Sequence, residues 1–159
     1  MKFVKAEEVD IDQIVQVVQK TIVEIYPKYY PKEVTDFFLK HHNRDNIEAD
    51  VKKGNVWMLL KDDRLVGTGS YEGNHINRVY VRPDFQGSGY GGLIMDYMED
   101  KIKISFSSIV LDASLPACQF YEKKGFNTID HKKILLEKGK ILIYDRMKKD
   151  LIKDAKEYS

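Results

Sequence analysis

The sequence predicts a mixed α/β domain of the α+β kind, in which helices flank a mostly antiparallel sheet. Three short segments rich in apolar and β-branched residues, 56–60, 65–71 and 76–81, follow one another through tight turns. This order is typical of an antiparallel meander. A glycine-rich turn then leads into a segment with helical spacing. The 159 residues are expected to form one domain that ends in a charged, fraying tail at 148–159.

The N-terminal third is expected to hold one strand and three helical pieces. Residues 2–5 can form a short first strand. Apolar residues then recur at helical spacing through 11–25, with Asp10 placed as an N-cap. Pro31 suits the first turn of a second helical piece, and 46–53 can form a third.

The C-terminal half is expected to alternate helices and strands. The helix after the glycines includes 93–98, and 108–112 reads as a short buried strand. Ser114 can cap the next helix, which a lysine pair and Gly125 should close. Two further strands flank the turn at 137–140 and form a second hairpin.

Composition excludes several classes of protein. The net charge is +1, from 26 basic and 25 acidic residues, so no bulk field attracts nucleic acid or an anionic membrane. We expect no signal peptide and no membrane span, because the start is charged and no apolar run is long enough. The single cysteine suits a cytoplasmic protein. The adjacent His41 and His42 do not suggest a metal site, and none is expected.

The glycine-rich stretch is the strongest sign of function. Four glycines fall within six residues, at 87, 89, 91 and 92, between a strand and a helix. Backbone without side chains can turn successive N–H groups into one concavity, and the helix dipole adds positive potential there. The stretch therefore predicts a phosphate-binding loop.

Two nucleotide-binding patterns compete for this loop. Gly87 to Gly92 fits the dinucleotide pattern G-x-G-x-x-G, and Asp112 lies where a ribose-binding acid belongs. However, five residues including Pro83 separate the strand from the first glycine, and the preceding strands form a meander instead of a βαβ unit. A P-loop is excluded because no Lys-Ser or Lys-Thr follows the glycines.

The alternative pattern is Gln86-x-x-Gly89-x-Gly91, which resembles the acetyl-CoA pyrophosphate loop of the GNAT N-acetyltransferase superfamily. A second segment, Ala117-x-x-Phe120-Tyr121-Glu122-Lys123-x-Gly125-Phe126, is similar to the other hallmark of that superfamily and follows about thirty residues later. The resemblance covers nearly the whole chain. It implies a sheet splayed open between the strands at 76–81 and 108–112, with acetyl-CoA held in the gap as co-substrate.

The resemblance also implies which residues bind acetyl-CoA. Backbone groups of the strand would bind the pantetheine amides, and backbone amides of the loop would bind the pyrophosphate. Ser114 stands where the family often has Asn, so its reach is shorter, and Ser88 replaces a frequent basic residue. The expected cofactor-binding residues are Val79, Tyr80, Val81, Gln86, Gly87, Ser88, Gly89, Tyr90, Gly91, Gly92 and Ser114.

Two catalytic residues are expected. By resemblance, Tyr121 protonates the departing CoA thiolate, although a tyrosine on an amphipathic helix can also be a core residue. His75 stands at the strand position of the family's glutamate base, and an imidazole suits that role. A polar residue flanking a turn is the alternative reading of His75, and Glu72, Glu24 or water could act as base instead.

These expectations favour an acetyltransferase that moves acetyl from acetyl-CoA to a primary amine by direct attack in a ternary complex. The acceptor would be a small molecule or a peptide, and the tyrosines at 26, 29 and 30 could line its pocket. A homodimer is compatible with the sequence. The alternatives are a dinucleotide-binding redox module and a CoA-binding regulatory module without turnover.

Overall fold

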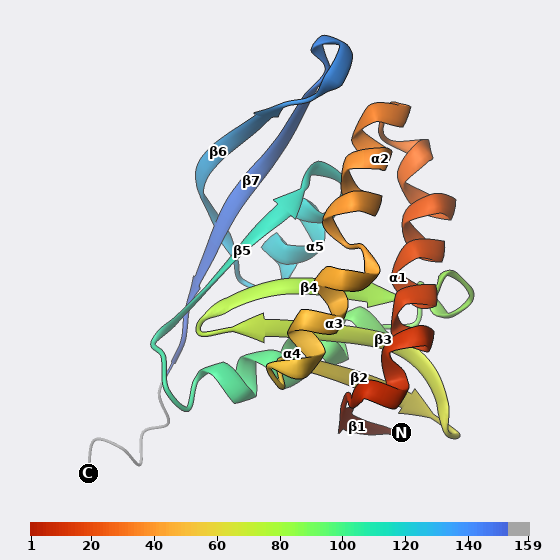
Figure 1. Cartoon of the computed structure of the whole chain (residues 1–159). Coiled ribbons are helices and arrows are strands. Elements are labelled where there is room, and N and C mark those ends of the chain that lie inside the picture. Colours follow the sequence, from red (N-terminus) through yellow and green to blue (C-terminus); the bar gives the residue numbers. More distant parts are fainter. Residues whose placement is uncertain (153–159) are drawn as a thin grey trace.

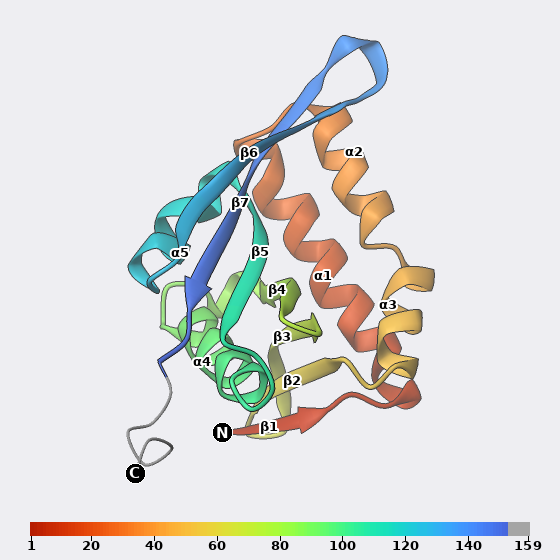
Figure 2. The same cartoon turned by 90° about the vertical axis from the view of Figure 1, so that its left-hand side faces the viewer.

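The computed structural model describes residues 1–152, in which a seven-stranded sheet is covered by helices on both faces (Figures 1 and 2). The strand order is β1-β2-β3-β4-β5-β7-β6. The strands are β1 (Lys2–Lys5), β2 (Val56–Lys61), β3 (Arg64–Glu72), β4 (His75–Val81), β5 (Ser108–Ser114), β6 (Asn127–Leu135) and β7 (Ile141–Asp150). The α-helices are α1 (Ile11–Ile25), α2 (Lys32–His41), α3 (Arg44–Lys52), α4 (Tyr90–Ile102) and α5 (Cys118–Lys123). Short 3-10 turns occupy η1 (Glu8–Asp10), η2 (Tyr26–Lys28), η3 (Pro83–Phe85), η4 (Leu115–Ala117) and η5 (Glu137–Gly139).

Two hydrophobic clusters hold the layers together. On one face, α1 and α3 bury apolar side chains such as Ile14 and Ile47 against the sheet. On the other face, α4 buries Ile94 and Met98 over β3. A Cβ at Gly69 would lie 2.7 Å from the Ile94 side chain, so the absence of side chains there lets α4 approach the strand closely.

The sheet is mostly antiparallel, and its one parallel contact is short. β4 and β5 pair only at His75↔Val110 and Ile76↔Leu111. Beyond Ile76 the pairing ends, and a β-bulge at Asn77 shifts the register of β4 against β3. These features confirm the predicted fold class and open a gap between β4 and β5.

The β6–β7 hairpin extends past the N-terminal end of α2 (Figure 1). β7 continues to Asp150, where it pairs with Ser108 of β5. The expectation that the tail frays from Lys148 is therefore wrong for 148–150, because all three residues pair with β5, Lys148 also pairs with β6, and Lys149 makes a 2.8 Å ion pair with Glu99. Residues 153–159 of the expected tail lie outside the described residues.

Two expected helix caps differ in the structure. Asp10 precedes α1, but its carboxylate accepts from the Glu7 N–H at 2.9 Å and so caps η1 instead. Ser114 ends β5 and precedes η4 without a side-chain capping bond. The reason is that the chain after Ser114 first makes a 3-10 turn around Pro116, and α5 begins only at Cys118.

Candidate active site

The glycine loop presents a row of unpaired backbone donors. Gly87 and Gly89 have φ angles of +81° and +85°, which glycine adopts without strain. Within residues 1–152, the N–H groups from Gly87 through Gly92 have no hydrogen-bond acceptor. The last three belong to the first turn of α4, where the helix dipole favours an anion. This geometry can bind a phosphate group.

A groove of about 480 Å³ runs from this loop along β4 to α5. The side chains of Val79 and Val81 form one wall, and those of Phe120 and Tyr121 form the other. Lys124 lies beside the loop: its Nζ would lie 3.6 Å from a Cβ at Gly92 and pairs with Asp96 at 2.6 Å. The groove is therefore apolar along its length and rich in donors at one end.

The open edge of β4 faces this groove. The Arg82 N–H donates to the Val66 carbonyl of β3 at 2.8 Å. Because antiparallel pairs alternate, the backbone groups of Val79 and Val81 then point away from β3, into the gap beside β5. The backbone of Tyr80 faces β3. Its side-chain hydroxyl shares a 3.1 Å hydrogen bond with the hydroxyl of Tyr26.

Tyr121 lies on α5 with its ring against Phe126 of the core. Its hydroxyl has no hydrogen-bond partner within residues 1–152. Protein atoms do not fully enclose this hydroxyl, so it reaches open space in the groove. Burial raises the pKa of Tyr121 well above its usual value. The phenol consequently keeps its proton at neutral pH.

A smaller pocket of about 250 Å³ joins this groove to the other face of the sheet. It shares Val79, Val81 and Gln86 with the groove and is also lined by the tyrosines at 26, 29, 30 and 80. The Leu115 N–H donates to the Tyr30 hydroxyl at 3.2 Å, which links the start of α2 to the end of β5. The pocket thus lies in the gap between β4 and β5.

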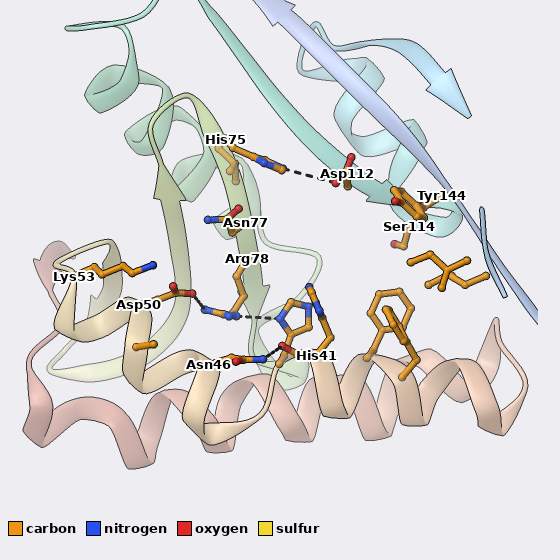
Figure 3. A pocket seen from close by; sticks show the side chains of 17 residues that line it. His41, Asn46, Asp50, Lys53, His75, Asn77, Arg78, Asp112, Ser114 and Tyr144 are labelled. Carbon is orange, nitrogen blue, oxygen red and sulfur yellow. Dashed lines mark hydrogen bonds and ion pairs between the residues drawn. The ribbon is translucent and has the colours of Figure 1, made fainter. Parts of the chain in front are cut away.

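A third cavity, of about 530 Å³, lies between α2, α3, the start of β4 and the β6–β7 hairpin (Figure 3). Ser114 lines both this cavity and the smaller pocket. His75 lies at its rim with Nε2 3.9 Å from Asp112 Oδ2. Asp112 in turn accepts two hydrogen bonds from Arg146, at 2.9 and 3.3 Å.

The sequence matches the family model described as an acetyltransferase (GNAT) domain over residues 25–150. This match spans most of the chain. The chain belongs to the GNAT acetyltransferase family. It is an acetyl-CoA-dependent acetyltransferase, and acetyl-CoA is its co-substrate. The glycine loop is therefore not evidence of a dinucleotide site, and Asp112 pairs with Arg146.

Solved structures share the fold of this acetyltransferase. A GCN5-related N-acetyltransferase from Rhodopseudomonas palustris has a TM-score of 0.85 at 21% identity, over 94% of this chain and 95% of that chain. The PaiA N-acetyltransferase from Thermoplasma acidophilum, in complex with coenzyme A, has a TM-score of 0.74 at 14% identity, over 94% and 98%. The putative acetyltransferase YncA from Salmonella typhimurium, with acetyl-CoA, has a TM-score of 0.68 at 18% identity, over 98% and 96%. No curated protein matches the sequence significantly.

The acetyltransferase brings the predicted residues together in two groups. The loop residues other than Ser88, together with Val79, Val81 and Tyr121, line the groove, whereas His75 lies in the larger cavity on the other side of β4. Ser114 lies between the two groups. In residues 1–152 no helix is long and apolar enough to cross a membrane, and no three acidic, histidine or cysteine side chains are grouped to hold a metal.

Sequence reasoning missed the buried charges of the larger cavity. Arg78 donates from Nε to His42 Nδ1 at 3.1 Å and from Nη1 to Asp50 Oδ2 at 3.0 Å. Burial, followed by the charge of Arg78, lowers the pKa of His42 to about 3, so this imidazole is neutral. An arginine directly before the apolar residues 79–81 of a strand was the available signal, since a buried charge there must face a partner or a cavity.

Proposed function

We propose that this acetyltransferase is an N-acetyltransferase, which moves acetyl from acetyl-CoA to the primary amine of a small molecule or peptide in a ternary complex. One observation carries the proposal. The groove beside the glycine loop and the separate cavity lie on opposite sides of β4, and a pocket in the β4–β5 gap joins them. Both substrates can therefore be bound together, with the reacting atoms meeting in the gap.

The donor would bind along the groove from the loop to the gap. The N–H groups from Gly87 to Gly92 would hold the pyrophosphate, helped by the helix dipole. The backbone groups of Val79 and Val81 would bind the pantetheine amides as an added strand does. Gln86 would hold the loop to the strand, and Ser114 would contact the pantetheine near the thioester.

The chemistry is an attack of the neutral amine on the thioester carbonyl. The new C–N bond forms as the C–S bond breaks, and the electron pair leaves on the CoA sulfur. Tyr121 would donate its proton to that sulfur, a role that its protonated phenol and open hydroxyl support. His75 would accept the proton of the amine, directly or through water, because it lines the cavity on the acceptor side.

The test combines binding and turnover. Thermal unfolding with CoA, acetyl-CoA, NADH and ATP should show stabilisation by CoA and acetyl-CoA only. Release of free thiol from acetyl-CoA with a panel of amines should give initial-rate lines that intersect, as a ternary complex requires. Stabilisation by NADH would instead favour a redox module. Stabilisation by CoA without thiol release from any amine would favour a regulatory module.

A further inference from the structure

The larger cavity contains a buried arginine whose hydrogen bonds are incomplete. The Arg78 residue is only 6% exposed, yet its guanidinium bonds only His42 and Asp50 within residues 1–152. Its Nη2 atom has no acceptor there, and protein atoms do not fully enclose it. This donor edge therefore faces the open space of the cavity that Arg78 lines (Figure 3).

The acidic side chains around the cavity are already engaged by arginines. Asp112 accepts from two nitrogens of Arg146, and Asp50 pairs with Arg78 at 3.0 Å. His42 is neutral and accepts from Arg78, so it adds no charge. The negative charges of the cavity are consequently offset by protein cations before any ligand binds.

The cavity also holds a cation with only a loose partner. Lys53 lines it, and the ammonium of Lys53 lies 3.7 Å from Glu72 with both side chains more than half exposed. Such an exposed pair contributes little and exchanges readily. Lys53 directly follows α3 and Arg78 lies on β4, and the close-up shows the Asp50 carboxylate between these two side chains (Figure 3).

The opposite side of the cavity is apolar and leads to the gap in the sheet. Phe38, Ile134 and Leu142 supply apolar surface, and Ser114 marks the passage to the smaller pocket. A ligand with its anionic end at Arg78 can therefore direct another group toward Ser114. Arginine suits a carboxylate because its N–H groups match the two oxygens.

We infer that the acceptor amine carries a carboxylate, which Arg78 binds from inside the larger cavity with help from Lys53. This inference rests on the proposed function and specifies its acceptor as an amino-acid-like compound with an apolar group. The carboxylate would be held by hydrogen bonds from the free edge of Arg78, and it would compete with Glu72 for Lys53. Arg78 is thus a specificity-determining residue of the acceptor site.

The test uses pairs of acceptors that differ only in the carboxylate. We compare L-phenylalanine with phenethylamine, and L-leucine with isopentylamine. The measured quantity is kcat/KM at saturating acetyl-CoA, calculated on the concentration of the unprotonated amine. We expect wild type to prefer the amino acid by about tenfold or more, as a charge-assisted pair in a buried site provides. Arg78→Lys keeps the positive charge beside Asp50 but loses the paired N–H groups of the guanidinium. In this variant the ratio of the two kcat/KM values should fall toward one.

Lys53→Gln should reduce the preference by a smaller factor. Because Lys53 is exposed, this variant should fold and so provides a second test if the arginine variant does not. Arg44→Lys is the matched control, since Arg44 pairs with Asp12 on the surface away from the cavity. It should keep the wild-type preference. Equal use of both members of each pair by wild type would overturn the inference, as would a preference that survives unchanged in Arg78→Lys.

A binding measurement separates this inference from the proposed function. Hydrocinnamate and its neutral amide, which carry no amine, are titrated into the CoA-bound protein by calorimetry. Binding of hydrocinnamate alone, weakened about tenfold in Arg78→Lys, supports the carboxylate site even if no amine releases thiol. Failure of hydrocinnamate to bind, or equal binding of its amide, counts against the site even if amines are acetylated.

Discussion

The side-chain amide of Gln86 donates a hydrogen bond to the backbone carbonyl of Val81 at 3.1 Å. Val81 ends β4, and Gln86 precedes the first glycine of the loop. The bond therefore fixes the glycine loop to the strand whose open edge faces the groove. It explains why a glutamine is needed here, because the acceptor is a carbonyl and a carboxylate could not donate to it.

Replacing Gln86 by Ala should weaken CoA binding without unfolding the protein. Loss of one hydrogen bond is worth about 1 kcal/mol, or about fivefold in Kd. Gln86→Glu should weaken it further, since it removes the donor and places a negative charge beside the phosphates. Calorimetry with CoA measures both. An equal or tighter Kd for Gln86→Glu would show that the loop is positioned in another way.

Replacing Gly89 by Val should weaken CoA binding by at least about tenfold. The φ angle of +85° is strained for a branched residue by about 1–2 kcal/mol, and relief of that strain would reorient the loop N–H groups. Gly139→Val is the matched control, because Gly139 also has a positive φ of 70° and open surroundings but lies in the distant hairpin turn. The control should lose stability and keep CoA affinity. Unchanged affinity in a folded Gly89→Val protein would remove the loop from the donor site.

Replacing Tyr121 by Phe should slow the chemical step by about a hundredfold while leaving acetyl-CoA affinity nearly unchanged. The ring and its packing on Phe126 are retained, and only the proton donor is lost. Tyr97→Phe is a control, since Tyr97 stacks on Phe3 on the other side of α4. Single-turnover rates with a saturating amine measure the step. Full turnover in Tyr121→Phe would leave the tyrosine as a core residue.

The buried His42 should make the fold sensitive to acid. Its pKa is lowered to about 3 by burial and by Arg78, whereas an unfolded imidazole titrates near 6.5. The stabilisation is therefore complete above about pH 6.5 and is lost as pH falls toward 3, because only the unfolded chain binds the proton. The loss approaches about 1.4 kcal/mol per pH unit.

Urea unfolding of wild type and His42→Gln between about pH 7.5 and pH 4.5 checks this linkage. The variant should be less stable than wild type at the upper pH, and its free energy of unfolding should fall less steeply below about pH 6.5. The two slopes should coincide above that pH. Parallel curves across the whole range would show that His42 is not held neutral in the folded state.

Local sequence signals were enough to predict the strands and the loop. Alternating apolar residues and tight turns predicted the meander of β2, β3 and β4, and the glycines predicted the turn that leads into α4. The tail was mispredicted at 148–150 because its charges suggested exposure, while β5 pairs with all three residues and β6 with the first of them. Pairing partners distant in sequence cannot be read from local composition.

The larger cavity could not be predicted for the same reason. His42 follows α2, Asp50 lies on α3 and Arg78 on β4, and only the packing of α2 and α3 over the sheet brings them together. In the sequence, His41 and His42 are two adjacent residues of a helix end. Nothing local distinguishes the buried imidazole from its exposed neighbour, so the charge network emerges only with the tertiary structure.

The last prediction concerns His75 and the proton of the amine. If His75 is the base, kcat/KM should rise with pH through two ionisations, one of the enzyme and one of the amine. In His75→Ala the rise caused by the ionisation of the enzyme should disappear, and the rise set by the more basic amine should remain. His131→Ala is the matched control, because His131 is exposed on β6 and pairs with Asp145 away from the cavity.

The comparison of variants is needed because any titrating group in the free enzyme or substrate can produce such a rise. His75 lies 3.9 Å from Asp112, which Arg146 already holds, so the imidazole has a neighbour that can orient it without binding it tightly. Profiles are measured at saturating acetyl-CoA with one acceptor. Identical profiles for wild type and His75→Ala would transfer the role to Glu72, Glu24 or water, and acetyl transfer itself would still stand.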